Sequence, residues 1–556
     1  MADSRIALYR RLYSNLTPWR NERLPFMIEV DTFIYPNRML RTTLPDRARQ
    51  QLRQDTEIIT SFARLRARDL RSALLSGICP QSFTWQYLYI PPSQKMADGQ
   101  PYQDNPQNST WLFTENEQQF SGLSTSNFYP QFGEHLNDAA NFRVGATLME
   151  LDYKTTSRYT TLRPGSYMLG YDEYGYANRI ARDEIFKLNE LVSKFGLENI
   201  SRPLQEKYKD PGHSEDDVAV IHVIGPNEIF DPNEPQSKFK KWSSCWFEAA
   251  TDENLDKFLC EEGFDAFPVL VTEWPDCPSW NAMSDIKQLY RMELDKLEAS
   301  EMMIRPPTIG PPTVARRAID KMPGGHTEIP EGASAENYIR ELFQRKLDPT
   351  LLVKIQDETK KIIADAYFSD TIVVISNLAE QAGHRTAYEI SQIKAEQLMK
   401  FGPVTQSFSH TLDCHEDLLF MFRMKLNIVP QLPPSLGGAV FKPDYVSVLS
   451  QAQKMSSLQA AKDLITEAGS IFQQGYQDIW DKINPEKILQ DMVEKYRLDP
   501  AYLRSDEAVA ALRQARQASQ QQLQAAQSAS LQAKSAQALG STPANADSLL
   551  AQMVQK

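Results

Sequence analysis

The sequence predicts an α+β fold in which helices predominate. Short alternating or β-branched runs stand among amphipathic helical patterns in the first 280 residues. Two long helical patterns, 284–304 and 349–368, flank a stretch rich in proline and glycine. From residue 444 onward the pattern is almost entirely helical. We therefore expect an α+β body, a central helix pair with an excursion between its members, and a helical C-terminal part.

The first 280 residues are predicted to alternate between helices and short strands. The expected helices cover residues 4–16, 45–78, 126–141 and 183–195. The expected strands cover residues 83–90, 144–153, 218–224 and 264–271, with a hairpin at 167–175 and 177–182. Residues 91–109 and the acidic run 210–217 are predicted to be loops. The arginine-rich part of the second helix also carries acidic residues, which is typical of a solvated or subunit-contacting face rather than a nucleic-acid site.

The central helix pair carries apolar residues at helical spacing. Leu294 and Leu297 lie in the first helix, and Ile355 and Ile362 lie in the second. Proline and glycine occur too often in residues 305–348 for a helix to continue there. The chain is therefore expected to leave the first helix, form a compact non-helical segment and return to the second helix.

The C-terminal half is predicted to be mostly helical. Thr386 and Glu389 form a capping box that opens a helix over 387–400, and a further helix covers 404–426. Residues 371–375 are apolar, and 381–385 contain a glycine break. The Ala/Gln-rich segment 505–538 has few large apolar residues, so a long, weakly packed helix and a disordered tail are both open.

Charge and composition exclude several classes of protein. The net charge of −12 argues against a surface that wraps nucleic acid, although an acidic wall would let a polyanion slide. No run approaches the roughly 18 apolar residues of a membrane span, and the first 20 residues lack a secretory signal. We expect cytosolic synthesis and no membrane contact. The five cysteines show no CxxC spacing and are expected to be free thiols.

No catalytic motif stands out, and no metal or cofactor site is expected. The sequence lacks GxxxxGK[ST], HExxH and GxSxG, and it has no GxGxxG after a strand. His410 and Cys414 stand four residues apart, a spacing that can hold a metal, but no second pair completes a zinc site. A satisfied core pair is the favoured interpretation. The neighbouring His415-Glu416 dipeptide lacks the second histidine of a zinc-protease motif. We therefore expect no enzyme.

A series of segments, in order over about 400 residues, resembles the head-to-tail connecting, or portal, proteins of short-tailed, T7-like bacteriophages. The segments are SALLSGICP (72–80), SNFY (126–129), GATLMELD (145–152), IHVIGP (221–226), GFDAFPVLVTEW (263–274), RPP (305–307) and TAYEI (386–390). The sequence departs from the family pattern at PDCPSW (275–280), where relatives more often carry a glycine-rich stretch.

The resemblance implies a ring, usually dodecameric, at one capsid vertex, through which viral double-stranded DNA enters and leaves. It implies a wing formed by 1–280 and 386–443, stem helices at 281–304 and 349–368, a clip at 305–348, a channel loop at 369–385 and a helical crown at 444–556. The implied partners are the terminase large subunit, the tail adaptor and tail proteins, and the capsid and scaffolding proteins. The implied location is the virion, after synthesis in the cytoplasm of the bacterial host.

The resemblance also assigns candidate site residues. The ring interface would use the four apolar stem residues Leu294, Leu297, Ile355 and Ile362. In the clip, terminase or adaptor docking would use the cations Arg305, Arg316, Arg317 and Lys321, which could equally serve only solubility. DNA-channel contacts would come from Lys354 and Lys361 on the stem and from His384 and Arg385 in the loop. The last two could instead cap the loop against a neighbouring wing.

Two rival functions stay open at this stage. A helical scaffold or an internal virion protein would share the composition of the C-terminal part, but it would not need the strands or the excursion. A nuclease or packaging ATPase would require the purified protein alone to nick DNA or hydrolyse ATP.

Overall fold

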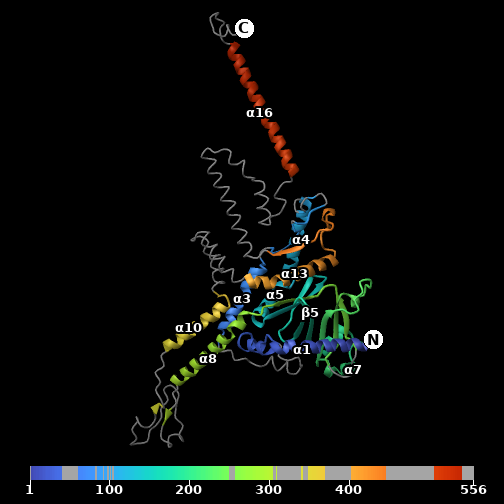
Figure 1. Ribbon diagram of the computed structural model, residues 1–556, viewed down its shortest axis with the longest axis vertical. Helices are drawn as coiled ribbons and strands as arrows, with labels where there is room; N and C mark the ends of the chain where they lie inside the picture. Colours follow the sequence, from blue (N-terminus) through green and yellow to red (C-terminus); the bar gives the residue numbers. More distant parts are fainter. Residues whose placement is uncertain are drawn as a thin grey trace. The chain divides into compact units, whose positions relative to one another are not determined.

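The computed structural model describes residues 2–39, 60–81, 84–91, 93–96, 99, 102, 105–249, 257–304, 308–309, 340–341, 349–369, 402–445 and 506–540 (Figure 1). The chain divides into two compact units. The first comprises Met1–Tyr89, Glu115–Pro430 and Lys442–Ser456, and the second comprises Ile90–Thr114, Gln431–Phe441 and Ser457–Lys556. Helices and antiparallel sheets occur together in the first unit, which confirms the α+β class.

A five-stranded antiparallel sheet forms one part of the first unit. Its strands follow chain order: β4 (Tyr167–Tyr171), β5 (Ala177–Lys187), β6 (Asp217–Pro226), β7 (Trp242–Glu248) and β8 (Cys260–Phe264). Val223 of β6 packs in one cluster with Tyr9 of α1 (Ala2–Phe33), whereas Val220 packs with Leu191 of α6 (Leu188–Phe195). Because residues of opposite parity point to opposite faces of a strand, the two helices cover different faces of this sheet.

A second sheet of three strands supports the main core. Its central strand β2 (Val144–Asp152) pairs with β3 (Thr156–Thr161) and β9 (Val269–Glu273). Helix α5 (Phe128–Phe142) packs on β2, and the close approach requires a glycine. A Cβ atom at Gly145 would collide with the carbonyl oxygen of His135. Gly145 thus holds the helix and the strand at this short distance.

The main core joins α3, α5, α8 and α13 around large aromatic side chains. Phe128 is fully buried, and its ring contacts those of Trp85, Phe132, Tyr159 and His415. We call these five residues the aromatic core.

The remaining elements of regular structure are α3 (Phe62–Ile78), α4 (Pro106–Thr125), α7 (Arg202–Tyr208), α8 (Pro278–Ile304), α10 (Pro349–Ala366), α13 (Gly402–Lys425), η2 (Pro211–His213), η3 (Ser237–Phe239), η4 (Pro434–Leu436) and the antiparallel pairs β1 (Gln86–Tyr89) with β12 (Lys442–Tyr445) and β10 (Thr308–Ile309) with β11 (Arg340–Glu341).

In the second unit, the described part of the Ala/Gln-rich tail is helical. Helix α16 (Asp506–Gly540) spans 35 residues, and every side chain from 510 to 535 is exposed. The sequence left a helix and a disordered tail open, and the structure has the helix. The predicted helices between residues 446 and 505 lie outside the described residues.

Several predicted boundaries were wrong in the N-terminal part. Helix α1 runs to Phe33, past the predicted end at residue 16, and contains Pro18 and Pro25. A proline inside a helix costs about 3 kcal/mol, and here the burial of Met27 and Val30 offsets that cost. Residues 106–109 were predicted to be a loop but begin α4. The second predicted helix is described only from residue 60, and α3 starts at Phe62.

Other corrections concern strands. Residues 183–187 were predicted to start a helix but extend β5, because Asp183 accepts hydrogen bonds from Tyr13 (2.8 Å) and Arg20 (2.6 Å) of α1. The predicted strand 264–271 is two strands, since β8 ends at Phe264 and β9 begins at Val269. Strands β3 and β7 and helix α7 were not predicted. Asp444 and Tyr445 belong to β12 rather than to a helix.

Candidate functional surface on the helix pair

Helices α8 and α10 lie side by side and form the central helix pair that the sequence predicts (Figure 1). Each helix begins with a proline, Pro278 and Pro349, which fits a first turn because its missing N–H has no helical partner there. Lys360 of α10 lies 3.7 Å from a carboxylate oxygen of Glu293 on α8. At its C-terminal end, α10 is anchored by Tyr367, whose hydroxyl donates to Asn141 of α5 over 3.1 Å.

The face of α10 that packs inside the protomer is half polar. Gln356, Thr359, Ile363 and Tyr367 are buried, at spacings of three and four residues. Only Ile363 among them is aliphatic. The apolar residues that the sequence assigned to the packing face therefore do not all serve the contact with α8.

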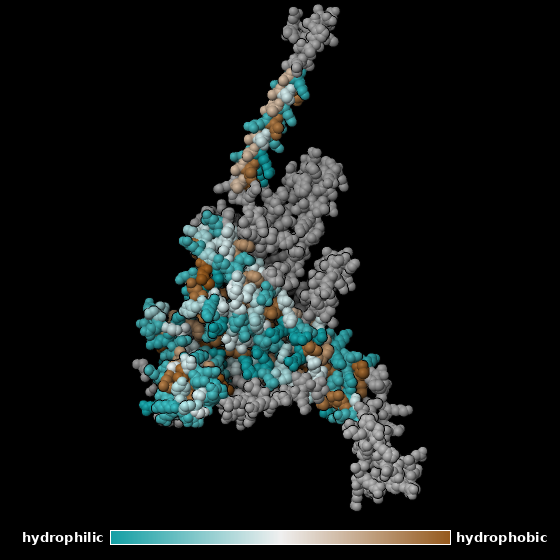
Figure 2. All heavy atoms as spheres, turned by 180° about the vertical axis from the view of Figure 1, so that it is seen from behind, coloured by the Kyte–Doolittle hydropathy of each residue, from teal (hydrophilic) through white to brown (hydrophobic). Residues whose placement is uncertain are grey.

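The predicted interface residues leave apolar surface exposed on both helices. Leu297 is 55% exposed and Ile362 is 52% exposed, Ile355 is 37% exposed, and Leu294 is half-buried. Counting about 100° per residue, Ile355 and Ile362 stand roughly a quarter turn from the buried face of α10. Figure 2 shows hydrophobic side chains gathered over this helix pair. Such side chains on a stable helix surface are typical of a contact with another protein.

The predicted channel-facing residues occupy a third face of α10. Lys354 and Lys361 are exposed, as are Glu358 and Asp365. By the same helical count, these four residues lie roughly opposite the buried face. No ion pair within 4 Å involves either lysine among the described residues. The two lysines are thus brought onto one solvent-facing stripe of alternating charge.

The remaining candidate residues cannot be placed. Arg305, Arg316, Arg317, Lys321, His384 and Arg385 lie outside the described residues. Of the excursion between α8 and α10, the structure describes β10 and β11, in which Thr308 pairs with Glu341 and Ile309 with Arg340. The outgoing and returning chain therefore pair with each other close to the helices, which the sequence did not predict.

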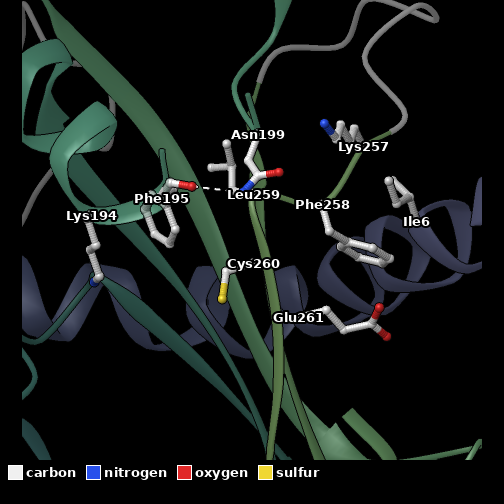
Figure 3. Close-up of a pocket in the computed structure, with 9 residues that line it drawn as sticks. All are labelled: Ile6, Lys194, Phe195, Asn199, Lys257, Phe258, Leu259, Cys260 and Glu261. Atoms are coloured by element: carbon white, nitrogen blue, oxygen red, sulfur yellow. Dashed lines mark hydrogen bonds between the residues drawn. The ribbon is translucent and has the colours of Figure 1, made fainter. Parts of the chain in front are cut away.

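A pocket of about 440 Å³ lies at the β8 edge of the five-stranded sheet, between α6 and the start of α1 (Figure 3). Its cations already have contacts. Lys257 donates to the carbonyl of Glu198 (2.7 Å), and Lys194 lies 4.1 Å from the ring centre of Trp246. Glu261 pairs with Arg5. In Figure 3 the two lysines lie on opposite sides of Cys260, so they do not converge on a common point.

The thiols and histidines form no metal site in the described part of the chain. No group of three or more His, Cys, Asp and Glu side chains there could hold an ion. The prediction of a core pair at His410 and Cys414 was wrong, because His410 is exposed and Cys414 is half-buried, with 3.6 Å between Nε2 and Sγ. The pair lies on the outer side of α13, and the buried histidine of this helix is its neighbour His415.

None of the described helices is long and apolar enough to cross a bilayer.

Comparison with known proteins places these features in one family. The model of a family described as bacteriophage head to tail connecting protein matches residues 7–503. The chain is similar to the portal protein of Salmonella phage epsilon15, with 26% identity over 553 residues that cover 97% of each chain. It is also similar to the probable portal protein of Bordetella phage BPP-1, with 25% identity over 538 residues, 94% of this chain and 93% of that one.

Proposed function

Because this chain belongs to the bacteriophage head to tail connecting protein family, we propose that it forms the portal ring of its phage, the channel through which DNA is packaged and ejected. The family resemblance seen in the sequence is confirmed over almost the whole chain. Membership of the family assigns the protein to the junction of head and tail in the virion. The observation that carries the ring proposal is the exposed apolar surface of α8 and α10.

The ring interface is proposed to lie on these stem helices. A closed ring of identical copies uses two different faces of each copy, one toward each neighbour. The helix pair offers two such faces, Leu294 with Leu297 on α8 and Ile355 with Ile362 on α10. We propose that the ring has twelve copies, and this number rests on the family resemblance alone.

The channel is proposed to be lined by the charged face of α10. Lys354, Glu358, Lys361 and Asp365 alternate in sign along the helix, so attraction and repulsion toward DNA phosphates nearly cancel along the path. A stripe of lysines alone would hold phosphates by releasing counterions. The alternation therefore suits DNA that must slide rather than bind.

The loop after α10 is proposed to add further contacts with DNA. His384 and Arg385 follow Gly383, and they would contact the phosphate backbone without reading bases. Particles that carry both His384→Ala and Arg385→Ala should assemble but package or retain less DNA. Full genome content and normal retention would remove this assignment.

The excursion between the stem helices is proposed to be a clip that docks the terminase large subunit or the tail adaptor. Arg305, Arg316, Arg317 and Lys321 make this segment locally basic in an acidic protein. Charge reversal at Arg316 and Arg317 should keep the ring but weaken docking in a salt-dependent way. Docking that is unchanged over all salt concentrations would mean that these cations serve solubility only.

We propose a structural rather than catalytic role, with capsid and scaffolding proteins as further partners. The rival assignment, a helical scaffold or internal virion protein, predicts no central hole. Negative-stain imaging of the purified protein, together with a mass measurement, separates the two. Closed rings with a central channel are expected, and monomers or open filaments at high protein concentration would overturn the proposal.

A further inference from the structure

A layer of buried polar side chains lies inside the first unit, where α13 passes α4 and strand β1. We define this polar layer by five buried residues, Gln86, Glu115, Gln119, Glu416 and Arg423, together with the exposed Gln118 at its edge. Glu115, Gln119, Glu416 and Arg423 are each at most 4% exposed. Buried polar groups are normally paired, so each member should have a partner.

Glu115 has all the partners that a buried carboxylate needs. Arg423 donates to it twice, from Nε to Oε1 (2.8 Å) and from Nη2 to Oε2 (3.0 Å). The amide of Gln119 donates a third hydrogen bond to Oε1 (3.1 Å). This two-pronged pair joins α4 to α13 and neutralises both charges.

Glu416, about two helical turns before Arg423, has no such partners. Among the described residues, neither of its buried carboxyl oxygens has a hydrogen-bond donor, and neither does the Oε1 atom of Gln86. The donors of Arg423 and the Gln119 amide are directed to Glu115, Gln118 and the carbonyl of Ile428. Glu416 is therefore an acidic side chain in the core whose charge nothing in this layer neutralises.

An ionised Glu416 would add a net negative charge to the layer, since Glu115 and Arg423 already cancel each other. Isolating an unpaired charge in a protein interior is costly, and the group neutralises instead. Burial, together with the nearby charges of Glu115 and Asp417, raises the pKa of Glu416 to about 8. Gln119 and Arg423 oppose this shift only in part.

Apart from Arg423, which pairs with Glu115, the titratable groups that the structure describes around Glu416 supply no compensating cation. On α13 itself, Asp413 accepts a hydrogen bond from Tyr445 of β12 (2.9 Å), and His415 meets the hydroxyl of Tyr159 on β3 (2.9 Å). Burial lowers the pKa of His415 to about 3, so this ring is neutral. The hydroxyl of Ser157 donates to Tyr159, which leaves the Tyr159 proton for Nε2 of His415.

We propose that Glu416 is a proton-binding site built into this core: the packing of α13 on α4 holds the neutral carboxyl, and release of its proton favours an opened arrangement in which the carboxyl reaches water. The ligand is the proton itself, and the responding element is α13, which also carries the aromatic-core residue His415. The inference does not depend on the portal function.

The direction of the pH effect follows from linkage. An acid whose pKa is raised in the packed state keeps its proton there and loses it in the opened state. The packed arrangement is therefore most favoured below the ordinary glutamic acid pKa. This preference for the packed arrangement decreases as the pH rises from the ordinary pKa to the raised pKa of about 8. Within that window, the equilibrium constant for opening should rise about tenfold for each pH unit.

Hydrogen exchange of the full-length protein measures this opening. In peptides that cover α4 and α13, the hydrogen-exchange rate should rise with pH more steeply than the intrinsic exchange rate does. Glu416→Gln should abolish this additional rise between about pH 6 and pH 8. The glutamine keeps the shape of the side chain but has no proton to lose. Peptides from β6 serve as an internal reference, because they contain no part of the polar layer.

Two further variants keep the test decisive. Asp417→Asn removes a carboxylate from the next, exposed position and should keep the pH dependence, with its upper end moved to lower pH because the charge of Asp417 contributes to the raised pKa of Glu416. Glu416→Leu removes the polar group altogether and should also abolish it, so it replaces the glutamine variant if that protein does not fold. An unchanged pH dependence in either Glu416 variant would overturn the proposal.

Discussion

The aromatic core and the helix pair differ in what covers their apolar side chains. Phe128 is fully buried among the rings of Phe132 from its own helix and of Trp85, Tyr159 and His415 from three other parts of the chain. Leu297 and Ile362 keep more than half of their side chains in solvent. Both regions carry large apolar side chains on helices, Phe128 on α5 and Leu297 and Ile362 on α8 and α10. The core is therefore complete within one protomer, whereas the helix pair keeps apolar side chains exposed that further protein could cover.

The largest effect is expected in the aromatic core. Phe128→Ala should lower the free energy of unfolding by about 3–5 kcal/mol, because it removes a fully buried ring and leaves a cavity. Phe230, which is half exposed, provides the control, since Phe230→Ala should change the stability by less than about 1 kcal/mol. Urea unfolding measures both. Equal losses would mean that the core is not complete within the protomer.

A smaller loss is expected where α5 approaches β2. Gly145→Ala should destabilise the protein by about 1–3 kcal/mol, because the new methyl group meets backbone rather than a movable side chain. Gly122 in α4 has no atom within 4 Å of an added Cβ, so Gly122→Ala should stabilise the helix by up to about 1 kcal/mol. Opposite signs in thermal unfolding support the described contact, and a neutral Gly145→Ala would contradict it.

The smallest effect on stability is expected on the charged face of α10. Lys354→Glu with Lys361→Glu should change the free energy of unfolding by less than about 0.5 kcal/mol per site, because both side chains are exposed and neither forms an ion pair with a described residue. Ring assembly should persist. If the face lines the channel, the variant stripe becomes wholly acidic, and the DNA content of particles should fall. Normal packaging would place the channel wall elsewhere.

The sequence predicted the helix pair and its charged stripe because apolar and charged residues recur at helical spacing along these mostly exposed helices. Helix α4 was not predicted, for the opposite reason. Its buried positions include Glu115, Asn116 and Gln119, so polar residues occupy the face that a periodicity count expects to be apolar. Only the three-dimensional neighbour Arg423, 308 positions along the chain, explains why Glu115 can be buried.

The strand errors have a related cause. Residues 183–187 of β5 include two acids and a lysine, and the burial of Asp183 depends on Tyr13 and Arg20 from the first helix of the chain. Local composition contains no sign of that contact. Among the candidate site residues, Lys354, Lys361 and the four apolar positions were placed on the helices that the sequence assigned to them. Their roles in the ring and the channel remain predictions.

The most direct test of the contrast between core and helix pair combines Leu297→Asp with Ile362→Asp. Both side chains are exposed in the protomer, so thermal unfolding of the protomer should change little, while a charge buried between copies should prevent assembly. The matched control is Leu197→Asp, an exposed leucine outside the helix pair (44% exposed), which should leave assembly intact. Native mass measurement should show a folded monomer for the double variant and a ring for the control. Rings of normal mass from the double variant would contradict it.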